Sequence, residues 1–393
     1  MPSSADNQIT IEIDGINFED FKTGNVSRDF SNFCGSFSFK SSKDKANDFE
    51  IDAQSYCNIY VNGKKAMTGV IDKVEPSEDP EGSEVNISGR DITCDLVDSS
   101  LPAPIMLSGD FDLVTVIEKV LEVFSLKDTI KVINKIPDLR KFTSADIISS
   151  EEDKNAFEFM NDYAQKVSAI LVTDEDGNIV ITRAGEETVR DQILNVFDND
   201  ENNVLSSSAS YDFSQRFYQY IVISQSNSTT AKKEINASNV SCKGVAYDTE
   251  VRKSRTLVIK AENACDSETC TEIATLEANV RRANSLKYNC SVAGYQLNSG
   301  KLYSTNIIMT VIDDDVFIEA PLLVKAVSFS FGDGSITDLE FATPDAYTLQ
   351  ANLDEVDART SQLNKKKKKK KKGKKGKQAS QAEVDELNKL LGI

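Results

Sequence analysis

Arg90 is the residue whose neighbours are best suited to form an ion pair or to bind a charged ligand. It follows Gly89 and stands beside two aspartates, Asp91 and Asp95, in the stretch 69–100. A guanidinium can hold a carboxylate through two parallel hydrogen bonds, and a glycine leaves the backbone free to bend. These residues suit either a ligand site or a structural ion pair at the end of a hairpin. We favour the structural interpretation.

A second polar group, at Asp174, Asp176 and Asn178, has the alternation of a calcium loop. An EF-hand loop needs glycine at its sixth position and glutamate at its twelfth. Here the glycine is fourth and the twelfth residue is Gly185. The sequence therefore predicts a hairpin turn, and the acidic run 313–315 is likewise interpreted as a solvated loop.

The cysteines offer little metal or redox chemistry. There are seven, and only Cys265 and Cys270 are close together, with no second pair and no histidine to complete a zinc site. We predict reduced thiols. Because the chain has no histidine at all, Ser-His-Asp and Cys-His catalysis are excluded. The 63 acids make carboxylate pairs common by chance, so we predict no catalytic group, no cofactor and no metal.

Charge is distributed unevenly along the 393 residues. The net charge is −18, yet eleven lysines lie within residues 365–377; the other 34 basic residues face 63 acids, a formal charge of −29. An acidic body repels nucleic acid. No apolar run approaches the roughly 20 residues that span a bilayer, so no membrane-spanning segment is expected. The first residues, MPSSADNQ, do not resemble a secretory signal.

Residues 1–100 are expected to form an antiparallel β unit. Apolar residues alternate over 9–13, 57–61 and 84–90, and Asn62-Gly63 is a strong hairpin signal. The strand 68–74 should lead into a solvated acidic turn at 76–83, where two prolines interrupt the ladder. A small closed barrel would leave this unit without exposed edges.

Residues 101–203 should form an α/β unit. Apolar residues from Leu113 to Leu121 lie on one helical stripe, and a second helix is expected to open at Ser149 or Ser150. A β-hairpin over 169–182 follows, and 198–203 is interpreted as a linker.

Residues 204–346 are expected to form a second β unit. Strands are predicted at 211–224, 256–260, 288–294, 307–311, 322–331 and 336–342, with a helical insertion over about 266–285 capped by Ser267. The fold class is thus α+β, with two small antiparallel β-barrel domains on either side of an α/β domain. No internal sequence repeat relating the two β units is evident.

Residues 347–393 should form a flexible, lysine-rich tail. Its lysine run cannot pack on itself, because like charges repel. A short amphipathic helix should follow a capping box at 380–383. The tail is either a solubilising extension or a tethered peptide that docks on an acidic partner surface. The candidate partner-binding residues are Lys365, Lys366, Lys367, Lys368, Lys369, Lys370, Lys371, Lys372, Val384, Leu387, Leu390 and Leu391.

Three ordered motifs resemble those of one family. The first is G-x-I-D, an acidic spacer and V-x-I-x-G-R-D-x-T-x-D-L-V-D-S, the second D-F-x-x-R-F-x-x-Y, and the third G-Y followed by G-x-L-Y. Together they resemble the Mu-type phage baseplate hub family, which is related to the T-even phage hub, the tail protein D group and VgrG-like spikes. The matching residues are Gly69, Asp72, Gly89, Arg90, Asp91, Asp95, Asp212, Phe213, Arg216, Phe217, Tyr220, Gly294, Tyr295, Gly300, Leu302 and Tyr303.

The resemblance implies a non-enzymatic structural role. A family member would form a ring, expected to be a homotrimer, whose six barrels match a hexameric tail tube to a trimeric central spike. It would contact baseplate wedge or tape-measure proteins, line the path of ejected DNA without binding it specifically, and reside in the virion tail baseplate after assembly in the host cytoplasm.

Two other functions remain open from the residues. A spike-associated cell-wall hydrolase would need a carboxylate with a raised pKa in a cleft, and no segment marks one. A protein that binds nucleic acid or acidic surfaces through its lysine tail would bind without sequence preference and with strong salt dependence.

Overall fold

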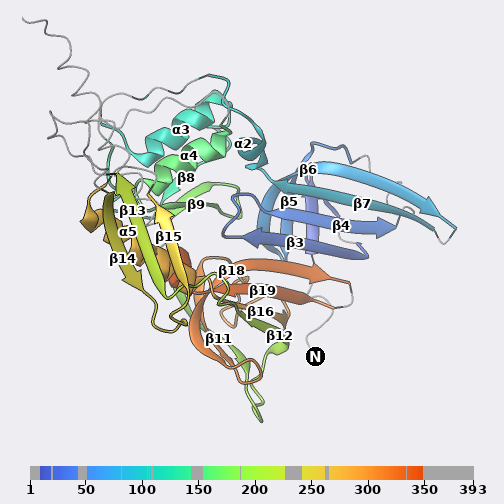
Figure 1. The fold of residues 1–393 in the computed structure, drawn as a ribbon. Coiled ribbons are helices and arrows are strands. Elements are labelled where there is room, and N and C mark those ends of the chain that lie inside the picture. Colours follow the sequence, from blue (N-terminus) through green and yellow to red (C-terminus); the bar gives the residue numbers. More distant parts are fainter. Residues whose placement is uncertain are drawn as a thin grey trace, which may run out of the picture.

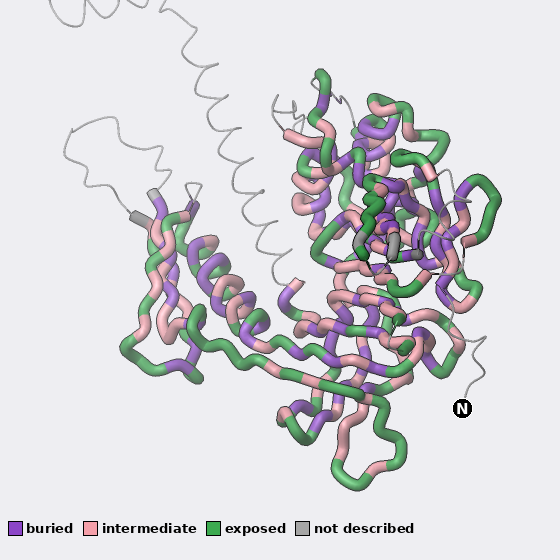
Figure 2. The backbone as a smooth tube through the Cα atoms, turned by 90° about the vertical axis from the view of Figure 1, so that its right-hand side faces the viewer, coloured by how far each residue is buried: buried purple, intermediate pink, exposed green. Residues whose placement is uncertain are grey.

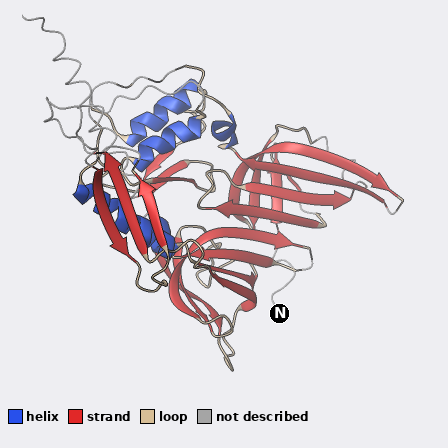
Figure 3. Ribbon diagram, in the orientation of Figure 1, coloured by secondary structure: helices blue, strands red, loops and turns tan. Residues whose placement is uncertain are grey.

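The computed structural model describes residues 9–347, except for 19–20, 43–50, 81, 104, 106, 108–109, 143–153, 186, 226–240, 262–264 and 333. The predicted tail, with its lysine run and terminal helix, lies outside the described residues. Within them the fold is α+β and rich in strands (Figure 3). None of the described helices is long and apolar enough to cross a membrane.

Thirteen strands form one large sheet, whose path runs β12-β16-β19-β18-β3-β4-β7-β6-β5-β1-β2, with β17 joining β18 to β11 (Figure 1). Their bounds are β1 Ile9–Ile13, β2 Ile16–Phe18, β3 Thr23–Asp29, β4 Ser36–Ser42, β5 Tyr56–Val61, β6 Lys64–Asp79, β7 Gly82–Asp91, β11 Glu187–Asn195, β12 Val204–Tyr211, β16 Leu286–Ala293, β17 Ile307–Asp313, β18 Ile318–Phe331 and β19 Ile336–Ala342.

Two smaller units extend from this sheet (Figure 1). One is a three-stranded sheet, β8-β10-β9, packed with helices; the other is the sheet β14-β13-β15, against which a single long helix lies. The first contains α2 Cys94–Asp98, α3 Leu113–Val123, β8 Val132–Asn134, α4 Ala156–Gln165, β9 Ile170–Thr173 and β10 Ile179–Thr182. The second contains β13 Gln219–Gln225, β14 Ser241–Tyr247, β15 Thr256–Lys260 and α5 Ser267–Ala283.

The two halves of the large sheet are joined by β3 and β18. These strands pair antiparallel from Ala326–Asp29 to Phe331–Gly24. One hydrophobic core continues across the joint, because Ile11 and Phe39 of the first half and Tyr288 and Phe341 of the second belong to the same buried cluster. Figure 2 shows buried and exposed positions alternating along many strands, the period expected of a sheet with one buried face. The pairings among the described strands do not close either half of the sheet into the predicted barrel.

Several predicted boundaries were wrong. β6 and β7 extend through the expected solvated loop and pair until Asp79–Gly82, so the turn is much shorter than 76–83. Pro76 fits within β6 because, among the described strands, this part of β6 pairs on one side only. The predicted strand 211–224 is two strands, β12 and β13, with a turn over 212–218.

Two helix starts also differ from the predictions. α4 begins at Ala156, where Asn155 and Glu158 form a capping box, rather than at Ser149 or Ser150. α5 is capped by Asp266, whose side chain accepts from Thr269 N, rather than by Ser267. In both cases the side-chain oxygen of the observed capping residue accepts from a backbone N–H of the first turn, which the predicted serine would have had to do.

Candidate functional site

The glycines of the first motif make room for an aromatic ring. Gly69 and Gly89 lie on the neighbouring strands β6 and β7, and the ring of Phe37 packs over both. A Cβ at Gly89 would lie 2.1 Å from Val70 O and 2.5 Å from Phe37 Cζ; one at Gly69 would lie 2.6 Å from Arg90 O. These glycines are therefore needed for close strand approach, and the predicted role of Gly89 in a bend was wrong.

Arg90 makes an ion-pair network with partners other than those predicted. Its Nε and Nη2 donate to both oxygens of Asp72, at 2.7 and 3.2 Å, and Nη1 and Nη2 donate to Asp98, at 3.0 and 2.8 Å. Asp91 points to the opposite face of β7, since successive strand residues alternate, and Asp95 is exposed on α2. Asp72 reaches Arg90 from a β-bulge between Ile71 and Lys73.

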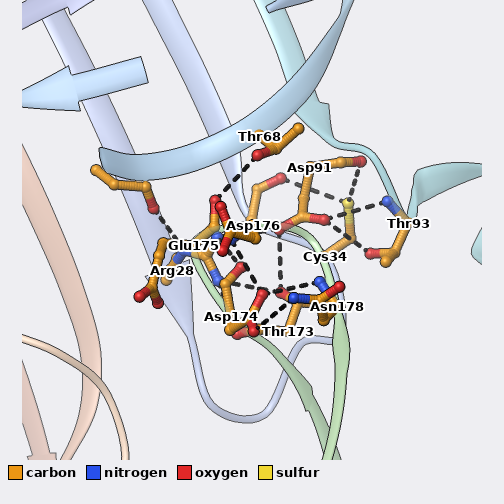
Figure 4. A network of polar contacts seen from close by, with 12 residues as sticks. Arg28, Cys34, Thr68, Asp91, Thr93, Thr173, Asp174, Glu175, Asp176 and Asn178 are labelled. Atoms are coloured by element: carbon orange, nitrogen blue, oxygen red, sulfur yellow. Dashed lines mark hydrogen bonds and ion pairs between the residues drawn. The ribbon is translucent and has the colours of Figure 1, made fainter. Parts of the chain in front are cut away.

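Asp91 belongs to a buried junction with Arg28, which the sequence did not reveal (Figure 4). Arg28 Nη2 donates to Asp91 Oδ2 at 3.1 Å, and the same guanidinium donates to the carbonyls of Ala66, Thr173 and Asp174 at 2.8–3.2 Å. Thr173 Oγ1 donates to Asp91 Oδ2 at 3.0 Å. This junction therefore ties β3 and β7 of the large sheet to the hairpin β9–β10.

Burial raises the pKa of Asp91, and Arg28 together with hydrogen bonds from Thr93 and Thr173 offsets only part of that rise. The carboxylate is fully buried. Asp174 in the same network closes the hairpin turn, since its Oδ1 accepts from the backbone N–H groups of Asp176 and Asn178 at 3.0 and 2.8 Å. The prediction of a hairpin turn at these residues is consistent with this geometry.

The second motif builds another buried junction around Arg216. Its Nε and Nη2 donate to the two oxygens of Asp248 at 2.9 and 3.1 Å, and it also pairs with Glu250. The guanidinium lies 4.3 Å from the centroid of the Phe213 ring. Arg282 of α5 donates to Asp248 Oδ1 at 3.1 Å. The junction thus fastens the turn after β12 to β14 and α5.

Asp248 differs from Asp91 in the direction of its pKa shift. Burial acts to raise the pKa of Asp248, but the hydrogen bonds from Arg216 and Arg282 outweigh it and the pKa is lowered. The remaining motif residues pack around this pair: Phe217 N donates to the hydroxyl of the fully buried Tyr220 at 3.0 Å. Asp212 accepts from Ser214 N at 2.7 Å and so shapes the turn.

The third motif is a small hairpin that folds back onto the core. Gly294 and Gly300 have φ of 78° and 79°, which glycine adopts without strain. Tyr303 N donates to Tyr295 O at 3.1 Å, and Leu302 forms a bridge with Gln296. Tyr295 is buried against Phe329, with its hydroxyl donating to Ser330 O at 2.9 Å. The motif therefore fixes the connection between β16 and β17.

The three motifs do not converge on one site. Each stabilises a different turn or junction. Asp95 is the exception, because its side chain is exposed and, among the described residues, meets only a weak contact from Cys94 Sγ, although its carbonyl accepts from Ser99 N at 2.9 Å. A groove of about 560 Å³ lies between the two halves. It is lined by short polar side chains such as Ser27, Ser208, Ser291 and Ser328.

The buried thiols have lost acidity. Desolvation raises the pKa of the half-buried Cys34, and of the buried Cys57 and Cys290, to about 12. All seven cysteines are free, and the Sγ atoms of Cys265 and Cys270 lie 3.3 Å apart. Such thiols are protonated at neutral pH and behave as apolar core residues.

Comparisons with known proteins point in the same direction as the motifs. Residues 8–91 match the family described as Mu phage baseplate assembly protein GpP-like, N-terminal. Over 331 residues the chain is 22% identical to the baseplate hub protein gp44 of Escherichia phage Mu, covering 83% of this chain and 85% of that protein.

Two solved structures share the fold. A 43 kDa tail protein of prophage MuSo2 from Shewanella oneidensis superposes with a TM-score of 0.72 at 24% identity, covering 87% of this chain and 99% of that one. A tail protein from Neisseria meningitidis MC58 gives 0.71 at 18% identity, covering 88% and 99%. The resemblance to the Mu-type phage baseplate hub proteins, indicated by the three sequence motifs, is therefore confirmed.

Proposed function

We propose that this chain is a structural baseplate hub protein of a contractile phage tail and resides in the virion. The observation that carries the proposal is its similarity to the Mu hub protein over most of both chains. The site geometry agrees with it, because the motif residues bury ion pairs, fill glycine gaps and cap turns. We infer that the protein works by shape and assembly, without catalysis.

The finer assembly is also part of the proposal. The chain forms a homotrimer that joins the hexameric tail tube to the central spike, contacts baseplate wedge or tape-measure proteins, and surrounds the path of DNA. Each half of the large sheet acts as one barrel-like unit of the ring. The domains of the chain are 1–100, 101–203, 204–346 and 347–393, of which the first and third contribute these two units. The formal charge of −29 outside the lysine run would keep DNA from adhering.

The lysine-rich tail is proposed to be a docking peptide for an acidic surface of a tail partner. Removing residues 380–393 should then block particle assembly while the purified chain keeps its oligomeric state. Infectious particles of normal yield from that deletion would contradict the docking role.

The hub function itself is tested in the particle. An antibody against this chain should label the tail end that is distal to the head, and loss of the chain should leave tubes without spikes. Labelling along the whole sheath, or complete tails assembled without the chain, would overturn the proposal.

A further inference from the structure

The two halves of the large sheet are built from the same five strands in the same order. In the first half the neighbours are β5-β6-β7-β4-β3, and in the second they are β17-β18-β19-β16-β12. The chain visits the five strands in the same sequence in each half, and every one of these pairings is antiparallel. The halves are therefore structural repeats, although no sequence repeat was evident.

The two halves can be aligned residue by residue at the fourth of the five strands in chain order, which is β6 in the first half and β18 in the second. β6 has a bulge between Ile71 and Lys73, and β18 has one between Val324 and Ala326. The carbonyl just before each bulge accepts a backbone hydrogen bond from a residue with positive φ: Gln54 N to Ile71 O at 2.6 Å, and Asn306 N to Val324 O at 2.9 Å. Lys73 thus corresponds to Ala326.

The end of the first strand in chain order, β3 in the first half and β12 in the second, supports the same alignment independently. The strand registers extend this alignment from β6 and β18 to the neighbouring pair β7 and β19, then to β4 and β16, and finally to β3 and β12. On this alignment Asp29 is equivalent to Asp212. Both residues begin the sequence Asp-Phe-Ser, and both accept from the backbone N–H two residues later, at 2.7 Å. β12 is therefore the counterpart of β3.

Inside one chain, β3 of the first half pairs with β18 of the second half. The counterpart of β3 is β12 and the counterpart of β18 is β6, and the corresponding edges of β12 and β6 are not paired with each other in the described strands. Among the described strands, β12 pairs only with β16, and β6 beyond Ile71 pairs only with β7. Phe30, beside the used joint, is 3% exposed and packs on Tyr347, whereas its counterpart Phe213 is 45% exposed.

We propose that β12 of one subunit pairs antiparallel with β6 of the next, in the register that β3 and β18 use within a chain. Asp212 then lies opposite Lys73, Ser210 opposite Glu75 and Ser208 opposite Ser77. Both charged members of the first pair are exposed in a single chain, so they gain a cross-strand ion pair. This inference deepens the proposed hub function by naming the contact that closes the ring.

The repeated joint has the geometry of a ring-forming interface. It uses one edge of each copy against a different edge of the next, and such head-to-tail contacts close into rings when the rotation allows it. An added strand supplies main-chain hydrogen bonds, which give affinity without an apolar patch. Pro76, the counterpart of Phe329, has no N–H, so this ladder has one donor fewer than the joint inside the chain.

Disulfide trapping tests the register. In the double variant Glu75→Cys with Ser210→Cys, oxidised glutathione should link neighbouring subunits into covalent oligomers that run up to the closed ring on a non-reducing gel. The matched control, Ser27→Cys with Ser328→Cys, should form its disulfide inside one chain and stay at monomer mass. A second control, Glu75→Cys with Ser207→Cys, places the second thiol on the other face and should link poorly.

Light scattering of the same samples separates this contact from the hub function. If the protein is oligomeric but the Glu75–Ser210 variant stays at monomer mass on the gel, the joint is overturned while the hub proposal stands. Equal linking of the Ser207 control overturns the register. A monomer by both assays overturns the joint and weakens the proposed ring as well.

Discussion

Two buried arginine–aspartate pairs attach the two smaller units to the large sheet, and they differ in how many arginines each aspartate meets. Arg28 and Asp91 hold the hairpin β9–β10, where Asp91 meets one arginine and two threonines. Arg216 and Asp248 hold the β14–α5 unit, where Asp248 meets two arginines. The pKa of Asp91 is raised and that of Asp248 is lowered.

The difference shows that burial alone does not decide the direction in which the pKa of a buried carboxyl shifts. Both carboxylates are fully buried, and burial acts to raise both pKa values. At Asp91 one arginine and two threonines offset the effect of burial only in part, whereas at Asp248 the hydrogen bonds from two arginines outweigh it. The second junction should therefore depend strongly on ionised Asp248, and the first should depend less on the ionisation of Asp91.

Breaking the second junction should have the largest effect. Asp248→Ala leaves Arg216 buried without its main partner, and we expect a loss of about 3–5 kcal/mol in the free energy of unfolding. Urea unfolding measures the loss, and hydrogen exchange should localise it to 241–285. Glu250→Ala, which removes an exposed partner of the same arginine, is the matched control, and we expect about 1 kcal/mol or less. Equal losses for the two variants would contradict the account.

Replacing each aspartate by asparagine sharpens the comparison through pH. A lowered pKa means that Asp248 stabilises the fold above the pKa of the unfolded chain, near 3.8, and that this is lost as pH falls through its folded pKa. A raised pKa means that the contribution of Asp91 is full below about 3.8 and is lost as pH rises through its folded pKa.

The two variants should therefore show opposite pH slopes. The cost of Asp248→Asn should shrink on acidification from pH 7 towards 3, and the cost of Asp91→Asn, about 1–3 kcal/mol at most, should grow. Thermal unfolding of both variants and the wild-type chain across this range measures the slopes. Parallel slopes would show that the two junctions do not differ as described.

Arg90 provides the exposed reference for both buried pairs, and its loss should matter least. Its side chain and those of Asp72 and Asp98 are each about a third or more exposed, so solvent screens the network. We expect Arg90→Gln to cost about 1 kcal/mol or less. Asp95→Ala, at the partner predicted from sequence, should change stability by less than about 0.5 kcal/mol. A cost for Asp95→Ala above that of Arg90→Gln would contradict the observed pairing.

Much of the fold was predictable because its signals are local. Apolar alternation placed β1, β17 and β19, and a helical stripe placed α3 and α5. β3, with the sequence TGNVSRD, has too little apolar alternation to be found, although it joins the two halves. One of its two partners is the neighbouring β4, but the other, β18, is distant in the sequence, and no local pattern encodes that pairing.

The junctions were only half visible for the same reason. Asp91 and Arg216 stand in motifs, but their partners Arg28 and Asp248 are ordinary residues in the sequence and meet them only through the fold. Arg90 was assigned the nearest carboxylates, whereas strand alternation points Asp91 away from it. The shared Asp-Phe-Ser at 29 and 212 was present in the sequence, but three residues are too few to reveal a repeat.

The most direct test of the hub account is the mass of the purified chain in solution, measured by light scattering with and without residues 348–393. The account predicts a trimer of 43.3 kDa chains in the full-length protein and again in the shortened one, because the proposed joint lies between β12 and β6. The account would be contradicted if both proteins were monomers at every concentration measured and stayed monomers when the tail tube or central spike protein was added.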